Sequence, residues 1–145
     1  MTQKPEQPVQ LVDILRADFR TSAFADRSNT ELQHALELPF RYHPARLAIA
    51  VSLSDPSPPP MAPDATGRPI KGETLFGQDE LELAMWTGLI VEHAAVAAIT
   101  RRHLQDLVSA HWQRGVAKLW SIWTASAEQR DHFFIALAGS PLADA

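Results

Sequence analysis

The sequence predicts an all-α protein of about five helices in one compact domain. Apolar residues recur three and four positions apart in several segments, as on the buried face of an amphipathic helix. Helix-capping patterns stand before several of these segments. The chain has 145 residues, of which 46% are apolar. A chain of this length can bury roughly 68% of its unfolded surface, which predicts a single core.

The first helix is predicted after an N-terminal arm. Residues 1–27 form this arm and first segment, and residues 28–145 form the helical domain. A helical period begins only at Leu11, and residues 19–24 are compatible with a short strand or an extended arm. Ser28 stands three residues before a glutamate, which is the spacing of a capping box. This pattern predicts a helix over 29–38 that ends before a proline.

A second helix is predicted from Pro44, whose missing N–H would have no partner in a first helical turn. This helix is apolar on nearly all sides, which predicts that it is buried. We expect it to end at residues 54–55. The prolines between residues 56 and 63 exclude a helix there and predict an extended connection. Residues 64–67 resemble a turn, and residues 70–76 are a second candidate strand or loop.

Three further helices are predicted in the second half of the chain. Residues 78–93 have a helical period and acidic residues in the first turn, where they complement the helix dipole. Thr100 is placed to cap a fourth helix that runs to about Trp123. Ser126 begins another capping-box spacing and opens a last helix, which Gly139 is expected to end.

Composition and motifs exclude several kinds of site. The absence of cysteine excludes disulfides, thiolate metal sites and a cysteine nucleophile. No run of 18 uncharged apolar residues occurs and the N-terminus is polar, so we expect a cytoplasmic protein with neither a membrane span nor a secretory signal. The motifs of zinc proteases, serine hydrolases and phosphate-binding loops are absent. We therefore expect no catalytic residue, no metal and no cofactor.

The charge distribution leaves two interpretations open. A net charge of −4 and an isoelectric point of about 5.8 are not those of a strongly basic nucleic-acid binder. Between residues 93 and 120, however, four cationic residues accompany one acidic residue. These four are Arg101, Arg102, Arg114 and Lys118. They either neutralise phosphates or form a solvated face with ordinary surface ion pairs.

Several residues suit close packing or a subunit contact. Gly115 costs about 1 kcal/mol relative to alanine inside a helix, which predicts that another helix lies close, with direct ligand contact as the alternative. His111 lies on the apolar stripe and predicts a core or interface histidine rather than a metal ligand or an acid–base group. Trp112 and Trp120 predict core or interface contacts, with stacking on unpaired bases as the alternative. Arg46, in a nearly apolar helix, predicts an ion pair across an interface.

Three blocks of sequence occur in an order that is typical of one family. Residues 46–53 form an apolar segment that begins with arginine and ends in Ser-Leu. Residues 64–77 contain Asp-x-x-Gly followed by Thr-Leu-x-Gly, and residues 110–119 contain Ala-His-x-x-Arg-Gly. Read together across residues 38–123, these blocks resemble the DndE family of DNA sulfur-modification proteins.

The resemblance implies an α-helical, non-catalytic accessory subunit of bacterial DNA phosphorothioate modification, within restriction–modification. It also implies a homotetramer that works beside the other sulfur-modification proteins and binds duplex DNA, with a preference for nicked duplex, through basic residues. On this basis we expect DNA contacts at Arg101, Arg102, Arg114, Lys118, Arg68 and Lys71. We expect the oligomer interface at Arg46, His111, Trp112, Gly115 and Trp120. The alternative is an adaptor that bridges the modification proteins without binding DNA, which the net charge and the acidic helix over 29–38 favour.

Overall fold

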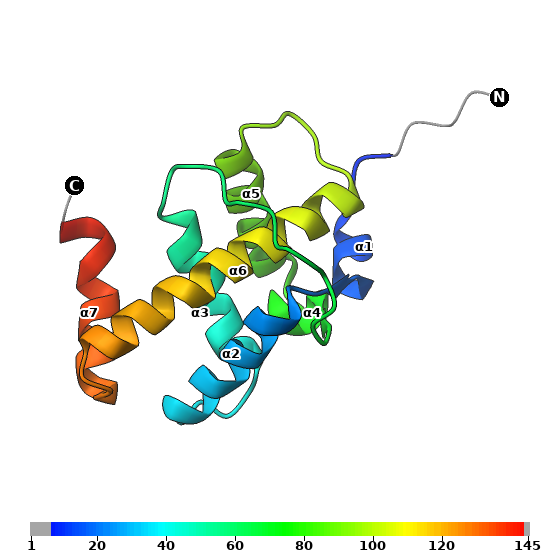
Figure 1. Cartoon of the computed structure of the whole chain (residues 1–145). Helices are drawn as coiled ribbons and strands as arrows, with labels where there is room; N and C mark the ends of the chain where they lie inside the picture. Colours follow the sequence, from blue (N-terminus) through cyan, green and yellow to red (C-terminus); the bar gives the residue numbers. More distant parts are fainter. Residues whose placement is uncertain (1–6, 144–145) are drawn as a thin grey trace.

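The computed structural model describes residues 7–143 of the chain (Figure 1). In chain order its elements are α1 (Leu11–Arg16), β1 (Asp18–Phe19), α2 (Ala23–Ala35), α3 (Tyr42–Leu53), β2 (Ile70–Lys71), α4 (Gly72–Leu75), α5 (Glu80–Ala94), α6 (Arg101–Ala125) and α7 (Arg130–Ala143). Helices dominate and pack around one core, which confirms the predicted fold class.

The longest helix, α6, crosses the molecule diagonally and packs against α3 (Figure 1). The two backbones approach so closely that a Cβ on Gly115 would lie 1.8 Å from the Ala48 carbonyl oxygen. The packing role predicted for Gly115 is therefore confirmed, since only glycine leaves room for this crossing. The core around it is formed by fully buried side chains that include Ile49, Leu104 and Trp112.

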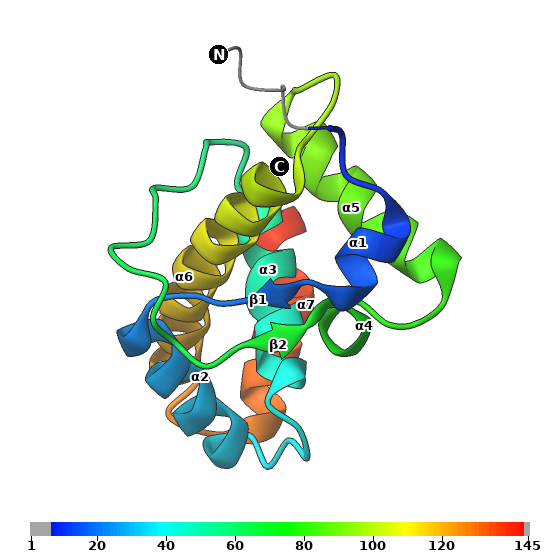
Figure 2. The same ribbon diagram turned by 90° about the vertical axis from the view of Figure 1, so that its right-hand side faces the viewer.

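The N-terminal segment belongs to the same core. A small antiparallel sheet places Asp18 opposite Lys71 and Phe19 opposite Ile70 (Figure 2). Phe19 is fully buried and meets the ring of Phe76 edge-on, with ring centroids 5.3 Å apart. Both undecided segments thus contain a short strand. The predicted boundary between residues 27 and 28 falls inside α2. Residues before this boundary, such as Ile14 and Phe19, supply side chains to the common core.

Two helix starts differ from the prediction. Helix α2 begins at Ala23 because Ser22 is its cap, with Ser22 Oγ accepting from the Ala25 N–H at 3.0 Å. Ser28 lies buried within this helix. The last helix begins at Arg130, because Ser126 closes α6 by donating to the Ile122 carbonyl at 2.7 Å. A serine can cap a helix or bond to its own preceding turn, so spacing alone does not separate the two cases.

Three other predicted features agree with the structure, and one does not. Pro44 lies in the first turn of α3, and the Thr100 hydroxyl caps α6 by accepting from the His103 N–H at 3.1 Å. The proline-rich connection leaves α3 and passes in an extended course across α6 before β2 (Figure 1).

Gly139 lies within α7, so the predicted end of that helix was wrong. In the described residues no helix is both long and apolar enough to cross a membrane.

Candidate nucleic-acid interface

Arg101 and Arg102 form the exposed first turn of α6. Neither side chain pairs with a carboxylate among the described side chains, and this first turn holds no acidic residue. Both arginines line a cavity of about 450 Å³ together with Gln7, Thr100 and Gln105. The positive end of the α6 dipole adds to their charge. This arrangement can bind an anion from solvent.

Arg114 and Lys118 lie further along α6 and are engaged within the chain. Arg114 is ion-paired with Asp55 at 3.6 Å, and its side chain is only 11% exposed. It also donates to Ser52 Oγ and to the Ser52 carbonyl, each at 2.8 Å, and to the Ser57 carbonyl at 2.9 Å. Lys118 reaches the same Asp55 carboxylate at 3.4 Å. These contacts hold the C-terminal end of α3 against α6.

The Asp55 carboxylate that receives both cations is itself fixed by its neighbours. The hydroxyl and the backbone N–H of Ser57 donate to it at 2.7 and 2.9 Å. These hydrogen bonds lower the pKa of Asp55 well below its usual range, and the charge of Arg114 lowers it further. Asp55 therefore stays charged at neutral pH and neutralises the two cations beside it.

His111 is buried next to this network. Its Nδ1 lies 2.8 Å from Ser52 Oγ, which also accepts from Arg114, so the serine hydroxyl is free to donate to the imidazole. The ring packs edge-on against His93, with centroids 4.7 Å apart. Burial lowers the pKa of His111 to about 4, and the charges of His93 and Arg114 contribute to the same shift. The histidine is neutral at neutral pH.

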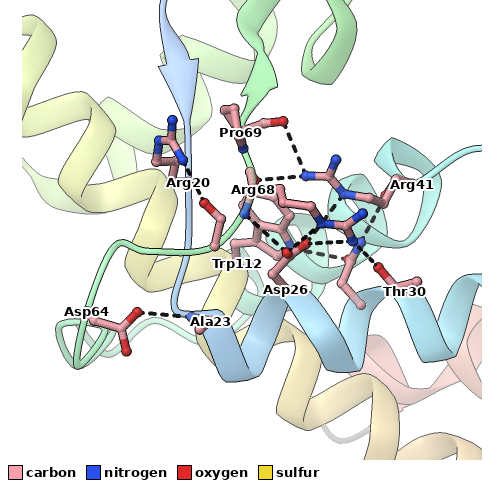
Figure 3. A network of polar contacts seen from close by, with 11 residues as sticks. Arg20, Ala23, Asp26, Thr30, Arg41, Asp64, Arg68, Pro69 and Trp112 are labelled. Carbon is pink, nitrogen blue, oxygen red and sulfur yellow. Dashed lines mark hydrogen bonds and ion pairs between the residues drawn. The ribbon is translucent and has the colours of Figure 1, made fainter.

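A second group of cations surrounds Asp26 on α2 (Figure 3). Arg68 Nε lies 3.0 Å and Arg41 Nε 3.4 Å from this buried carboxylate. Arg68 also donates to Thr30 Oγ1 at 2.7 Å. Burial lowers the pKa of Arg41, and the charge of Arg68 lowers it further, whereas the charge of Asp26 raises it. The Arg41 guanidinium nevertheless remains charged at neutral pH. Among the described side chains two guanidinium groups share this one carboxylate, which leaves a local excess of one positive charge.

Arg20, which the sequence analysis did not single out, lies beside this group (Figure 3). It is exposed, and its Nη1 donates to the Gly67 carbonyl at 3.0 Å. Arg20 and Arg102 line one cavity of about 480 Å³, which Asp18, Asp64 and Asp106 also line. The fold thus brings a residue next to β1 close to the start of α6. Arg20 and Arg102 are far apart in the sequence, so no sequence pattern could have predicted that they lie close together in the fold.

The other predicted DNA contact, Lys71, is paired with Asp18 at 2.9 Å. The six predicted cations therefore differ in their partners. Arg101 and Arg102 lie together, and Arg114 and Lys118 share Asp55. Arg68 shares Asp26 with Arg41, and Lys71 is paired with Asp18. Whether any of them contacts DNA stays a prediction.

The residues predicted at an oligomer interface are mostly interior. His111 and Trp112 have no exposed surface, and Gly115 is covered by Ala48, so the fold gives these three a packing role within one chain. Arg46 bonds the Leu75 carbonyl at 2.6 Å and lies 3.8 Å from Glu82 of its own chain. Trp120 is half-buried and donates to the Ser28 carbonyl at 3.2 Å.

Fold and surface together describe a small helical protein whose longest helix begins with two exposed arginines, which form no ion pair with a carboxylate among the described side chains. In residues 7–143 no group of three or more histidine, aspartate or glutamate side chains is arranged to hold a metal ion.

The sequence matches the family model of the DNA sulphur modification protein DndE over residues 18–125. This match covers well over half of the chain, so the chain belongs to the DndE family and to DNA sulphur modification. No curated protein and no solved structure matches it.

Proposed function

We propose that the protein is a non-catalytic accessory subunit of DNA phosphorothioate modification that binds duplex DNA, nicked duplex included, without sequence preference. The observation that carries the proposal is the pair Arg101 and Arg102, exposed in the first turn of α6 with no carboxylate on either among the described side chains. A phosphate held there meets two guanidinium groups and a helix N-terminus, which all favour negative charge.

Further cations extend the proposed contact. Arg20 lines one cavity with Arg102, where three aspartates reduce the local positive charge. Arg68 keeps 59% of its side chain exposed although it is paired with Asp26. Arg114, Lys118 and Lys71 contribute less, because a phosphate would have to displace a carboxylate from each. DNA binding thus depends mainly on the end of α6 next to β1.

The proposal includes a homo-oligomer. The exposed apolar face of α5 supports this part of the proposal. Leu81, Met85 and Leu89 follow one another at four-residue spacing and are 81%, 53% and 46% exposed. A Cβ on Gly88 between them would meet nothing within 4 Å. Such an apolar helix face on a small protein is typical of a contact with another chain. Sedimentation velocity of the purified protein measures the resulting mass directly.

Binding to a labelled 20-base-pair duplex, intact or nicked, at rising salt tests the DNA contact. Each phosphate contact releases counterions, so two to four contacts should give a slope of log K against log salt of about −2 to −4. Measurable binding that weakens in this way supports the proposal.

The second candidate function is an adaptor that joins other modification proteins without binding DNA. The net charge of −4 and the carboxylates that neutralise Arg114, Lys118 and Lys71 favour it. Absence of binding to either duplex at about 50 mM salt would leave the adaptor function, because electrostatic binding is strongest at low salt.

A further inference from the structure

The groove between α2 and α6 is a feature that the proposed phosphate contacts do not use. It holds a cavity of about 600 Å³, within the range of small-ligand sites. Phe24, Arg27 and Glu31 of α2 line one side, and Gln113 and Trp120 of α6 line the other. The cavity is open to solvent, so a group attached to a larger molecule can enter it.

Two aromatic residues, Phe24 and Trp120, line this α2–α6 groove. Phe24 is 66% exposed, which is unusual for a large apolar side chain. Trp120 is held in place because its indole N–H donates to the Ser28 carbonyl at 3.2 Å. Among the described residues neither ring stacks on another aromatic ring. A flat ligand therefore finds aromatic walls contributed by two helices.

The polar groups of the groove select among flat ligands. Arg27 offers N–H donors and Glu31 offers acceptors. Gln113 accepts from the Ser22 hydroxyl through its oxygen, which leaves its NH₂ group to donate. The Glu31 carboxylate disfavours a bare phosphate or carboxylate ligand. Mixed donors and acceptors around a stacking surface match the edge and face of an uncharged nucleobase.

The groove lies on the same side of α6 as one of the exposed arginines. Arg102 and Trp120 are eighteen residues apart, which is five helical turns, so they share a face about 27 Å apart along the axis. Nucleotides follow one another at about 3.4 Å along each strand of a duplex. About eight nucleotides span this distance, and they pass over residues 21–22, which cross α6 at Ser109 and Gln113 between Arg102 and Trp120.

We propose that the α2–α6 groove takes up one unstacked nucleobase, between Phe24 and Trp120, from DNA held by the arginines of α6. This inference rests on the proposed DNA contact. A base leaves the stack readily only at a gap, an end or a mismatch, so the groove adds affinity for interrupted duplexes. Stacking of one base on an aromatic side chain is worth about tenfold in affinity.

The test compares two duplexes that carry the same one-nucleotide gap and differ only opposite it. One has an unpaired thymine there, and the other has an abasic residue with the same phosphates. Fluorescence anisotropy should show the thymine duplex bound about tenfold more tightly by the wild-type protein. Phe24→Ala should reduce this difference to about threefold or less, because only Trp120 is left to stack on the base, and should leave binding of the abasic and intact duplexes unchanged. Phe24 is exposed, so the substitution spares the core.

Phe40→Ala is the matched control, because Phe40 is also a largely exposed phenylalanine, 56%, and lies outside the groove. It should keep the tenfold difference. Equal affinity of the wild-type protein for the thymine and abasic duplexes would overturn the nucleobase site. Binding of the intact duplex in the same experiment would still support the proposed DNA function. No binding to any of the duplexes would overturn both.

Discussion

Arg102 and Arg114 show how two similar residues of one helix acquire different roles. Both belong to the cationic stretch between residues 93 and 120, and the sequence gives no reason to separate them. In the fold Arg102 meets solvent, whereas Arg114 is surrounded by Ser52, Asp55 and Ser57. These partners lie 57 to 62 positions away along the chain. The spacing of the basic residues was predictable, but their neutralisation by distant residues was not.

His111 makes the stability of the protein depend on pH. Its pKa is about 4 in the folded chain and about 6.5 in an unfolded one, so the unfolded state binds the proton more tightly. Stability is complete above pH 6.5 and is lost as the pH falls towards 4. The expected loss of unfolding free energy between pH 7 and pH 4 is roughly 3 kcal/mol. Urea denaturation across this range measures it.

His111→Gln provides the comparison, since glutamine does not titrate. This variant should be less stable than the wild type at pH 7, because the packing of the buried ring is lost. The difference between the two proteins should shrink as the pH falls, since the other titratable groups are shared. A constant difference in unfolding free energy between the two proteins from pH 7 to pH 4 would show that the pKa of His111 is not lowered.

At the scale of elements, the long helices were predictable and the short ones were not. Helices α3, α5 and α6 are long apolar or amphipathic segments with clear first-turn signals, and each lies within about two residues of the prediction. Helix α4 has four residues and the two strands have two residues each, which is too short for any period. They exist because Phe19, Ile70 and Leu75 are buried in the common core, which is a property of the whole fold.

The crossing of α3 and α6 predicts opposite effects for two helix glycines. Gly115→Ala should lower the unfolding free energy by roughly 2 kcal/mol or more, because its Cβ would lie 1.8 Å from the Ala48 carbonyl oxygen and force the helices apart. Gly88→Ala is the matched control in α5, where the space is open. It should raise stability by up to about 1 kcal/mol through helix propensity. Similar urea midpoints for the two variants would contradict the close crossing.

At the scale of the whole molecule, acidic and basic groups are unevenly distributed. The start of α5 carries Asp79, Glu80 and Glu82, and the start of α6 carries Arg101 and Arg102. An overall charge of −4 therefore coexists with a local positive region. The sequence predicted such a region on α6 but extended it to Arg114 and Lys118, which the fold assigns to the junction with α3. It gave no sign of Arg20, which follows β1 and lines one cavity with Arg102.

The central claim is that the arginines at the start of α6, which pair with no carboxylate in the part of the chain that the structure describes, bind DNA. Cations already held by carboxylates are not expected to do so. Fluorescence anisotropy with an intact duplex at about 50 mM salt tests it on two double variants of equal charge change. Arg101→Ala with Arg102→Ala should weaken binding at least tenfold, since two phosphate contacts are lost. Lys71→Ala with Lys118→Ala should change binding less than threefold, because each lysine is paired with an aspartate. An equal loss in both, or a larger loss in the lysine variant, would contradict the account.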